Sequence, residues 1–209
     1  MAQPADRRQQ ILDAALRVFA QHGPHRASIK RIAAAAGLKS PALIYWYFKD
    51  KDDLFHSVMR DLYPVVDLAQ DAAALGALPP RRALARVARA YLAAFDNPDA
   101  VKLFRIYLAE AARSPKASER FLGPEMIKVK RTLVGYLRGQ VARGALRDHD
   151  PEASTRALMG ACLAYVLCRE LVLPLREGLP EPEAYVETVV GALLDGLAAG
   201  KGRDAAALG

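Results

Sequence analysis

The chain has few of the residues and runs that mark membrane, secreted and disulfide-bonded proteins. Its 209 residues include only two cysteines, Cys162 and Cys168. No apolar stretch reaches the ~18 uninterrupted residues that a membrane-spanning helix needs, and the N-terminus has no apolar core of a signal peptide. We therefore expect a cytoplasmic protein with no membrane partner. The cysteines are expected to be buried thiols rather than a disulfide.

Sequence signals for catalysis and for bound metal are also missing. The four histidines do not form a metal-ligand spacing with the cysteines. The string Gly-Lys-Gly at residues 200–202 lacks the spacing and strand context of a phosphate-binding loop. We predict neither an enzyme nor a metal or cofactor. The alternative is a catalytic carboxylate inside a helical bundle, for which Glu110 is the candidate.

Strand signals are absent, whereas alanine and leucine are abundant, so we predict an all-α fold. Glycine, proline and capping residues divide the chain into helices. The predicted helices span residues 7–22, 29–36, 41–48, 52–75, 81–95, 100–113, 118–142, 151–173 and 183–198. Residues 201–209 are small and polar and are expected to form a disordered tail.

The most informative stretch is residues 28–51, which has the layout of two short helices joined by a tight turn. Ser28 is suited to an N-cap, because its hydroxyl can accept from an otherwise unpaired backbone N–H. Apolar residues then recur at helical spacing, at Ile29, Ile32, Ala33 and Ala36. Gly37 follows, where a left-handed residue commonly closes a helix. Ser40 and Pro41 restart the chain as a cap with proline at the first helical position.

The second of these helices ends in aromatic residues and is followed by lysines. Its side chains divide into outward candidates (Ala42, Tyr45 and Trp46) and core candidates (Leu43 or Ile44, and Phe48). Lys49 and Lys51 flank Asp50, which is a third candidate cap. This layout is typical of a helix-turn-helix motif, in which the second helix reads base edges and neighbouring groups hold phosphates. The alternative is that the aromatic residues at 45–47 pack a small core.

Positive charge is concentrated around this motif. Residues 1–54 carry nine basic and five acidic side chains, a net charge of +4 out of +7 for the whole chain. Such a basic bias favours binding to a polyanion. Upstream, residues 7–22 are predicted to form a supporting helix that is stopped by Gly23 and Pro24. Its apolar stripe is Ile11, Leu12, Ala15, Leu16 and Phe19.

The motif resembles the DNA-binding domain of the TetR (tetracycline-repressor) family of bacterial transcriptional regulators. The matching positions are Ser28, Ile32, Ala33, Ala36, Gly37, Leu38, Ile44, Tyr45, Tyr47, Phe48, Lys51 and Leu54. The stretch from Gly37 to Tyr45 is one residue longer than the commonest family spacing. We place the extra residue in the turn, at Lys39, because an insertion inside the helix would rotate every contact by about 100°.

The resemblance implies which residues contact DNA. Phosphate contacts would come from Ser28, Tyr45, Tyr47 and Lys51. Base contacts would come from Ser40, Pro41, Ala42 and Trp46, and we expect Lys39 or an upstream basic residue to add a polar contact. Because this helix lacks the long polar groups that read guanine, we expect readout by shape and by methyl contacts. Alanine at Lys51 is expected to weaken binding to all sequences alike.

The resemblance also implies the organisation of the chain. Residues 1–50, with the connecting helix to about 56, would form the helix-turn-helix domain. Residues 51–200 would form a helical effector-binding and dimerisation domain, with the last two helices (residues 150–173 and 183–198) in the dimer interface. Aromatic residues on helices around a family-type pocket are Tyr91, Phe95, Phe104, Tyr107, Phe121, Tyr136 and Tyr165, each of which has core packing as its alternative.

The expected function is therefore that of a homodimeric repressor, which a small-molecule effector releases from a double-stranded DNA operator. Three alternatives remain at the level of sequence. The first is a DNA-binding regulator that another protein switches, the second is a helical carrier of apolar molecules, and the third is a monomer.

Overall fold

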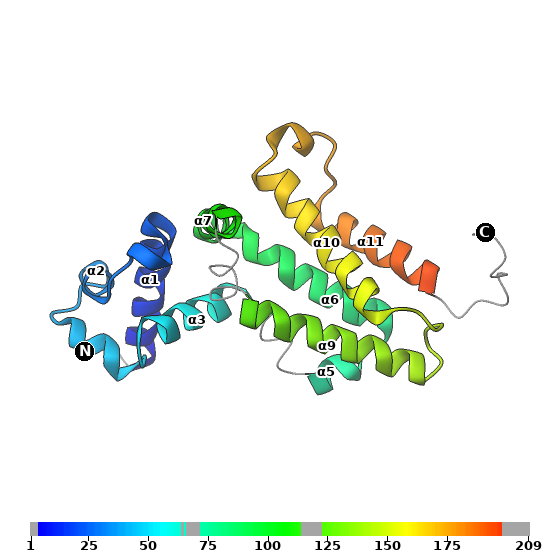
Figure 1. Ribbon diagram of the computed structural model, residues 1–209, viewed down its shortest axis with the longest axis horizontal. Helices are drawn as coiled ribbons and strands as arrows, with labels where there is room; N and C mark the ends of the chain where they lie inside the picture. The colour runs from blue at the N-terminus through cyan, green and yellow to red at the C-terminus, as the bar shows by residue number, and fades with distance from the viewer. Residues whose placement is uncertain (1–3, 64, 66–71, 114–122, 198–209) are drawn as a thin grey trace. The chain divides into compact units, whose positions relative to one another are not determined.

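The computed structural model of the protein describes residues 4–63, 65, 72–113 and 123–197, and its regular elements are helices (Figure 1). In chain order these are α1 (Pro4–Arg26), α2 (Ile29–Ala35), the 3₁₀-helix η1 (Pro41–Trp46), α3 (Lys51–Leu62), α5 (Ala72–Gly76), α6 (Pro80–Ala93), the 3₁₀-helix η2 (Ala94–Asp96), α7 (Pro98–Arg113), α9 (Gly123–Ala142), α10 (Pro151–Glu170), the 3₁₀-helix η3 (Leu173–Arg176) and α11 (Pro182–Leu197). No strand occurs within these described ranges. The predicted all-α fold is confirmed.

The chain divides into two packing units. The first comes from Met1–Val66 and Ala93–Met126, and the second from Asp67–Leu92 and Ile127–Gly209. Helix α7 therefore packs in the same unit as α1, although it lies far along the chain. The predicted functional boundary near residue 50 stays a prediction.

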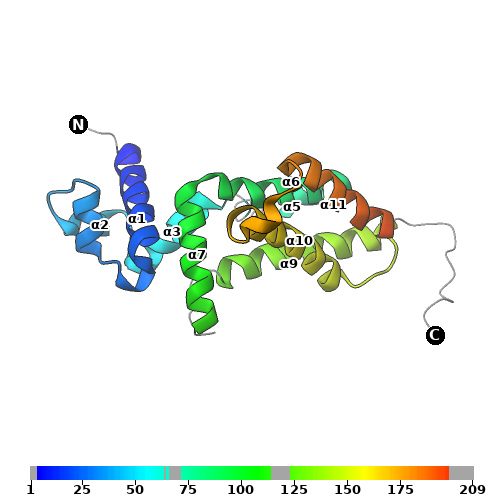
Figure 2. The ribbon, with the colours of Figure 1, turned by 90° about the horizontal axis from the view of Figure 1, so that it is seen from above.

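In the first unit, helix α1 packs against α2, α3 and α7 (Figures 1 and 2). The predicted apolar stripe of α1 faces this core, where Ile11 and Phe19 are fully buried. The Phe19 ring meets the Phe55 ring edge to face, with 5.1 Å between centroids, a favourable aromatic geometry. Gly23, with φ 74°, ends the regular turns of α1, as predicted.

In the second unit, helices α10 and α11 lie side by side (Figure 2). The largest fully buried side chains of this unit are Leu84, Leu92, Leu133, Leu137 and Leu158. The predicted cap at Asp150 is present, and its carboxylate accepts from the backbone N–H groups of Glu152 and Ala153. Arg89 on α6 holds α11 through a hydrogen bond of 2.8 Å from its Nε to Glu183.

Outside the helix-turn-helix, α3 and α10 end before their predicted C-termini. The connecting helix was predicted for residues 52–75 but ends at Leu62, because Tyr63 precedes a proline and leaves the helical region (φ −115°, ψ 86°). Helix α10 ends at Glu170 rather than near 173, and the chain continues into η3, with Pro174 in that segment. Predictions for residues 118–122 (with Phe121), for the side chain of Glu110 and for the tail at 201–209 lie outside the described residues.

No helix in the described part of the chain is long and apolar enough to cross a membrane. Within the same residues, no three His, Cys, Asp or Glu side chains are grouped so that they could hold a metal ion. Both cysteines are free thiols; burial raises the pKa of the Cys162 thiol to about 11, whereas Cys168 is half-buried.

Candidate nucleic-acid interface

Helix α2 begins after Ser28 and ends before Gly37, as the sequence predicts. The Ser28 hydroxyl accepts from the backbone N–H of Arg31 at 3.2 Å. At the other end Gly37 is left-handed (φ 64°), and the N–H of Leu38 donates to the Ala33 carbonyl at 2.9 Å. These bonds satisfy groups that the helix ends would otherwise leave unpaired. The predicted cap and turn are confirmed.

The second helix of the motif, η1, is tighter and shorter than the predicted α-helix over residues 41–48. Ser40 caps it by accepting from the Ala42 N–H at 3.2 Å, and Pro41 occupies its first position. The side chains of Ile44 and Phe48 are 0% and 2% exposed and anchor η1 on the core. At three residues per turn, the six residues of η1 make about two turns between the Ser40 cap and Tyr47. Short 3₁₀ segments are common in such places.

The predicted outward face of η1 is open to solvent. Trp46 and Tyr45 are 79% and 55% exposed, large fractions for aromatic side chains. Pro41 and Ala42 are also exposed, while Tyr47 is half-buried. The alternative in which the aromatic residues form a small core does not hold for Tyr45 and Trp46.

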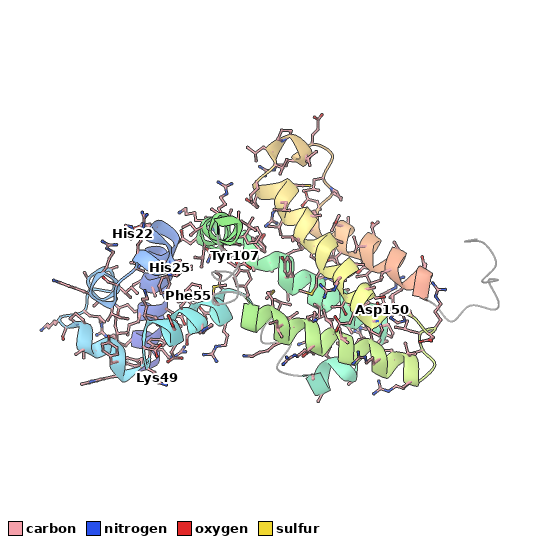
Figure 3. All side chains as sticks on the ribbon, in the orientation of Figure 1. His22, His25, Lys49, Phe55, Tyr107 and Asp150 are labelled. Atoms are coloured by element: carbon pink, nitrogen blue, oxygen red, sulfur yellow. The ribbon has the colours of Figure 1, made fainter. Side chains whose placement is uncertain are left out.

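The chain leaves η1 through a third cap, at Asp50. Its carboxylate accepts from the Asp53 N–H at 2.8 Å, and the Asp53 carboxylate accepts from the Lys49 N–H at 2.9 Å. The first bond caps α3, and the second ties the residue before the cap to the first turn of the helix. Lys49 remains exposed beside it (Figure 3).

Lys51, a predicted phosphate contact, has partners within the protein. Its ammonium donates to the backbone carbonyls of Pro24 at 2.9 Å and Ala27 at 3.2 Å, and more weakly to that of His25 at 3.5 Å. Sequence spacing did not indicate these contacts, because the carbonyls lie 24 to 27 residues earlier in the chain. The phosphate contact of Lys51 stays a prediction.

Other basic side chains of this unit are available to an anionic partner. Exposed cations on α2, in the turn and beside η1 are Lys30, Arg31, Lys39 and Lys49. Arg8 instead stacks on the Phe48 ring, with its guanidinium 5.2 Å from the centroid. The recognition helix therefore combines an exposed apolar tip with flanking positive charge.

The predicted effector-binding aromatic residues divide between the two packing units. In the first unit, Phe95 and Phe104 lie with ring centroids 5.1 Å apart and are buried, while Tyr107 is half-buried (Figure 3). In the second unit, Tyr136 and Tyr165 are buried, and their hydroxyls donate at 2.8 Å to the carbonyls of Leu78 and Pro180. Tyr91 is half-buried.

The first unit also contains a cavity of about 160 Å³ that sequence patterns did not indicate. It lies between α1, α3 and the segment that precedes α7. Its lining is Leu12, Asp13, Leu16, Val58, Asp61, Leu62, Ala93, Ala94 and Asn97, which includes none of the predicted effector-binding residues. Its polar rim is formed by side chains from separate elements, so no local motif marks it.

Both parts of the chain match models of known families. The model described as "Bacterial regulatory proteins, tetR family" matches residues 11–58. The model described as "AefR-like transcriptional repressor, C-terminal domain" matches residues 82–196. The matched ranges include the helix-turn-helix and the helices from α6 to α11.

Similar individual proteins are transcriptional repressors and regulators. The HTH-type transcriptional repressor Rv1474c of Mycobacterium tuberculosis is 30% identical over 165 residues, which cover 79% of this chain and 82% of that protein. The HTH-type transcriptional repressor AcnR of Corynebacterium glutamicum is 27% identical over 188 residues, 90% of this chain and 94% of that one. Among solved structures, FadR from Bacillus subtilis in complex with stearoyl-CoA superposes with a TM-score of 0.66 at 19% identity, covering 90% of this chain and 98% of that one. By the match of both its regions, this chain belongs to the TetR family of bacterial transcriptional regulators.

Proposed function

We propose that the protein is a homodimeric repressor that places η1 of each copy in the major groove of a double-stranded operator. The observation that carries this proposal is the recognition helix itself. Ile44 and Phe48 fix η1 on the core, while Tyr45 and Trp46 project into solvent. A rigidly held helix with an exposed tip is suited to enter a groove without a cost of ordering it first.

The contacts to DNA follow from the chemistry of the exposed groups. The hydroxyls of Ser28 and Ser40 accept cap bonds through their oxygens, so their own protons are available to donate to phosphate or to a base edge. Tyr45 and Tyr47 supply further hydroxyl donors to phosphate. Pro41, Ala42 and Trp46 present apolar surface suited to thymine methyl groups, and Lys39 adds the polar contact. The residues of the proposed interface are Ser28, Lys39, Ser40, Pro41, Ala42, Tyr45, Trp46 and Tyr47.

The dimer is proposed to form through α10 and α11. Exposed small residues line one side of α10, at Ala157, Gly160 and Ala164, where a second helix can approach closely. A two-fold dimer presents two recognition helices, and a spacing of about 34–36 Å between them lets both read one face of DNA.

The effector is proposed to be a small molecule that binds among the helices of residues 82–196. The candidates are Tyr91, Phe95, Phe104, Tyr107, Tyr136 and Tyr165. Tyr91 and Tyr107 are half-buried, so part of each side chain is accessible, whereas Tyr136 and Tyr165 are buried. Linkage requires that operator DNA weaken effector binding by the same factor by which the effector weakens operator binding.

A mobility-shift titration with the DNA that flanks the protein's own gene tests the proposal. We expect a salt-sensitive specific complex, which Trp46→Ala weakens. Lys128→Ala, an exposed cation on α9, is the matched surface control and is expected to have no effect. The absence of any specific complex at low salt would refute DNA regulation. Equal effector affinity with and without operator would refute effector-driven release.

A further inference from the structure

The break at the end of α1 creates carbonyls that need a partner. Gly23 (φ 74°, ψ 156°) interrupts the helix, and Pro24 follows it. The last carbonyls of a helix have no intrahelical donor and carry a partial negative charge. Here the donor is Lys51 Nζ, which lies 2.9 Å from the Pro24 oxygen and 3.2 Å from the Ala27 oxygen.

The position of Lys51 along its own helix is electrostatically unusual. It is the first residue of α3, where the helix dipole disfavours a positive charge and favours the acidic Asp52 and Asp53 that follow. Its side chain leaves this positive end and places the ammonium at the negative end of α1. The negative end of α1 therefore stabilises the positive charge of the ammonium, which the N-terminal end of α3 would destabilise.

The two segments joined by this ammonium lie at the boundaries of the helix-turn-helix. Ala27 directly precedes Ser28, the cap of α2, and Lys51 directly follows Asp50, the cap that ends the connection from η1. One half-buried side chain thus links the entrance of the motif to its exit.

We propose that Lys51 is a positioning residue of the recognition helix: it holds the 24–27 turn against the start of α3 and makes no phosphate contact. An ammonium has three donors. Two lie within 3.2 Å of carbonyls of this turn, and the His25 carbonyl, at 3.5 Å, is at the outer limit of a hydrogen bond. A phosphate would compete with these carbonyls for the ammonium. This inference rests on the proposed DNA-binding function and changes the role that family resemblance implies for this residue.

Salt dependence of operator binding separates the two roles. A lysine that neutralises a phosphate contributes about 0.9 to the slope of log affinity against log salt, whereas a lysine that acts through the protein contributes nothing. For Lys51→Met, which keeps most of the aliphatic stem, we expect about tenfold weaker binding, because hydrogen bonds to a charged group are lost. The slope is expected to equal that of the wild type. Lys49→Met removes the same charge from an exposed neighbour and is the matched control for long-range electrostatics.

A double variant tests whether Lys51 acts through the start of α2. If it does, the effects of Lys51→Met and Ser28→Ala on operator affinity are not additive, because both loosen the same turn. Lys51→Arg keeps a cationic donor and is expected to restore affinity to within a few-fold of the wild type. A slope reduced by about 0.9 in Lys51→Met, unchanged affinity, or strictly additive effects would each overturn the proposal.

Hydrogen–deuterium exchange of the free protein gives a readout that does not need DNA. We expect Lys51→Met to speed exchange in residues 24–48 and to leave residues 151–170 unchanged, with Lys49→Met behaving as the wild type. If the wild type binds no operator but this exchange pattern is seen, the proposed function fails and the positioning role stands. If exchange in residues 24–48 is unchanged, the positioning role fails whatever the DNA result.

Discussion

Trp46 and Ile44 lie two residues apart in η1 and have opposite surroundings, since Trp46 is 79% exposed and Ile44 is fully buried. We expect Trp46→Ala to cost about 1–3 kcal/mol of operator binding and to leave the melting temperature nearly unchanged. Ile44→Ala is expected to cost about 2–5 kcal/mol of folding free energy, because it opens a cavity beneath the recognition helix. Thermal unfolding and operator titration of both variants measure this contrast. If both variants lost the same folding free energy, the prediction that Trp46 serves DNA binding and Ile44 serves folding would be wrong.

Ionisation of Tyr136 makes the free energy of unfolding depend on pH in the alkaline range. Burial raises the pKa of Tyr136 to about 12, against smaller lowering effects of Arg143 and Gln140. The unfolded phenol ionises near pH 10, so the folded state loses stability as pH rises from about 10 to about 12.

Tyr136→Phe removes both this ionisation and the hydrogen bond to the Leu78 carbonyl. At pH 7 the variant is expected to be about 1 kcal/mol less stable than the wild type. The difference narrows above pH 10, because only the wild type can ionise. Urea unfolding at pH 7, 9 and 11 measures it, and a difference that stays constant over this range would refute the burial of this hydroxyl.

At the scale of elements, the turn between α2 and η1 depends on the backbone of Gly37. Its φ is 64°, and a Cβ added there would meet no atom within 4 Å. Gly37→Ala therefore tests backbone conformation alone and is expected to destabilise the protein by about 1–2 kcal/mol. Gly135→Ala, at an exposed helical glycine that also has no neighbour within 4 Å, is expected to stabilise by about 0.5–1 kcal/mol. Thermal unfolding should therefore move in opposite directions for the two variants.

Local chemistry explains which elements were predictable from the sequence. The caps at Ser28, Ser40, Asp50 and Asp150, and the left-handed Gly37, each act within three or four residues. The tight form of η1 depends instead on where Ile44 and Phe48 meet the core. The end of α3 at Leu62 also has a local signal in the sequence, the proline that follows Tyr63.

At the scale of the whole molecule, exposed apolar residues in the segment that connects α10 to α11 extend the proposed dimer surface. Leu173 and Leu175 in η3 are 61% and 58% exposed. We expect Leu173→Ser combined with Leu175→Ser to weaken the dimer at least about tenfold, since about 1.4 kcal/mol of lost apolar burial suffices. Ile127→Ser, at a 46% exposed residue on α9, is the control. Analytical ultracentrifugation over a dilution series measures the effect, and equal behaviour of both variants would exclude η3 from the interface.

Organisation at this scale was the least predictable from the sequence. Helix α7 joins the packing unit of α1, and the Lys51 ammonium meets carbonyls of the α1 turn. Both depend on contacts between segments distant along the chain, which helical spacing does not encode. The exposed face of η1 was predictable, because the residues that form it, Ala42, Tyr45 and Trp46, lie within one short segment of the motif.

The exposure of Trp46 has a spectroscopic consequence. Trp46 is the only tryptophan of the chain, so all tryptophan emission of the protein arises from the tip of the recognition helix. Docking on an operator would move the indole from water into the groove and change the intensity and wavelength of its emission. A molecule bound among the helices of residues 82–196 would change that emission only by moving the recognition helix. The unlabelled protein therefore carries its own fluorescent reporter. Its emission distinguishes direct docking on DNA from a movement of the recognition helix that effector binding causes.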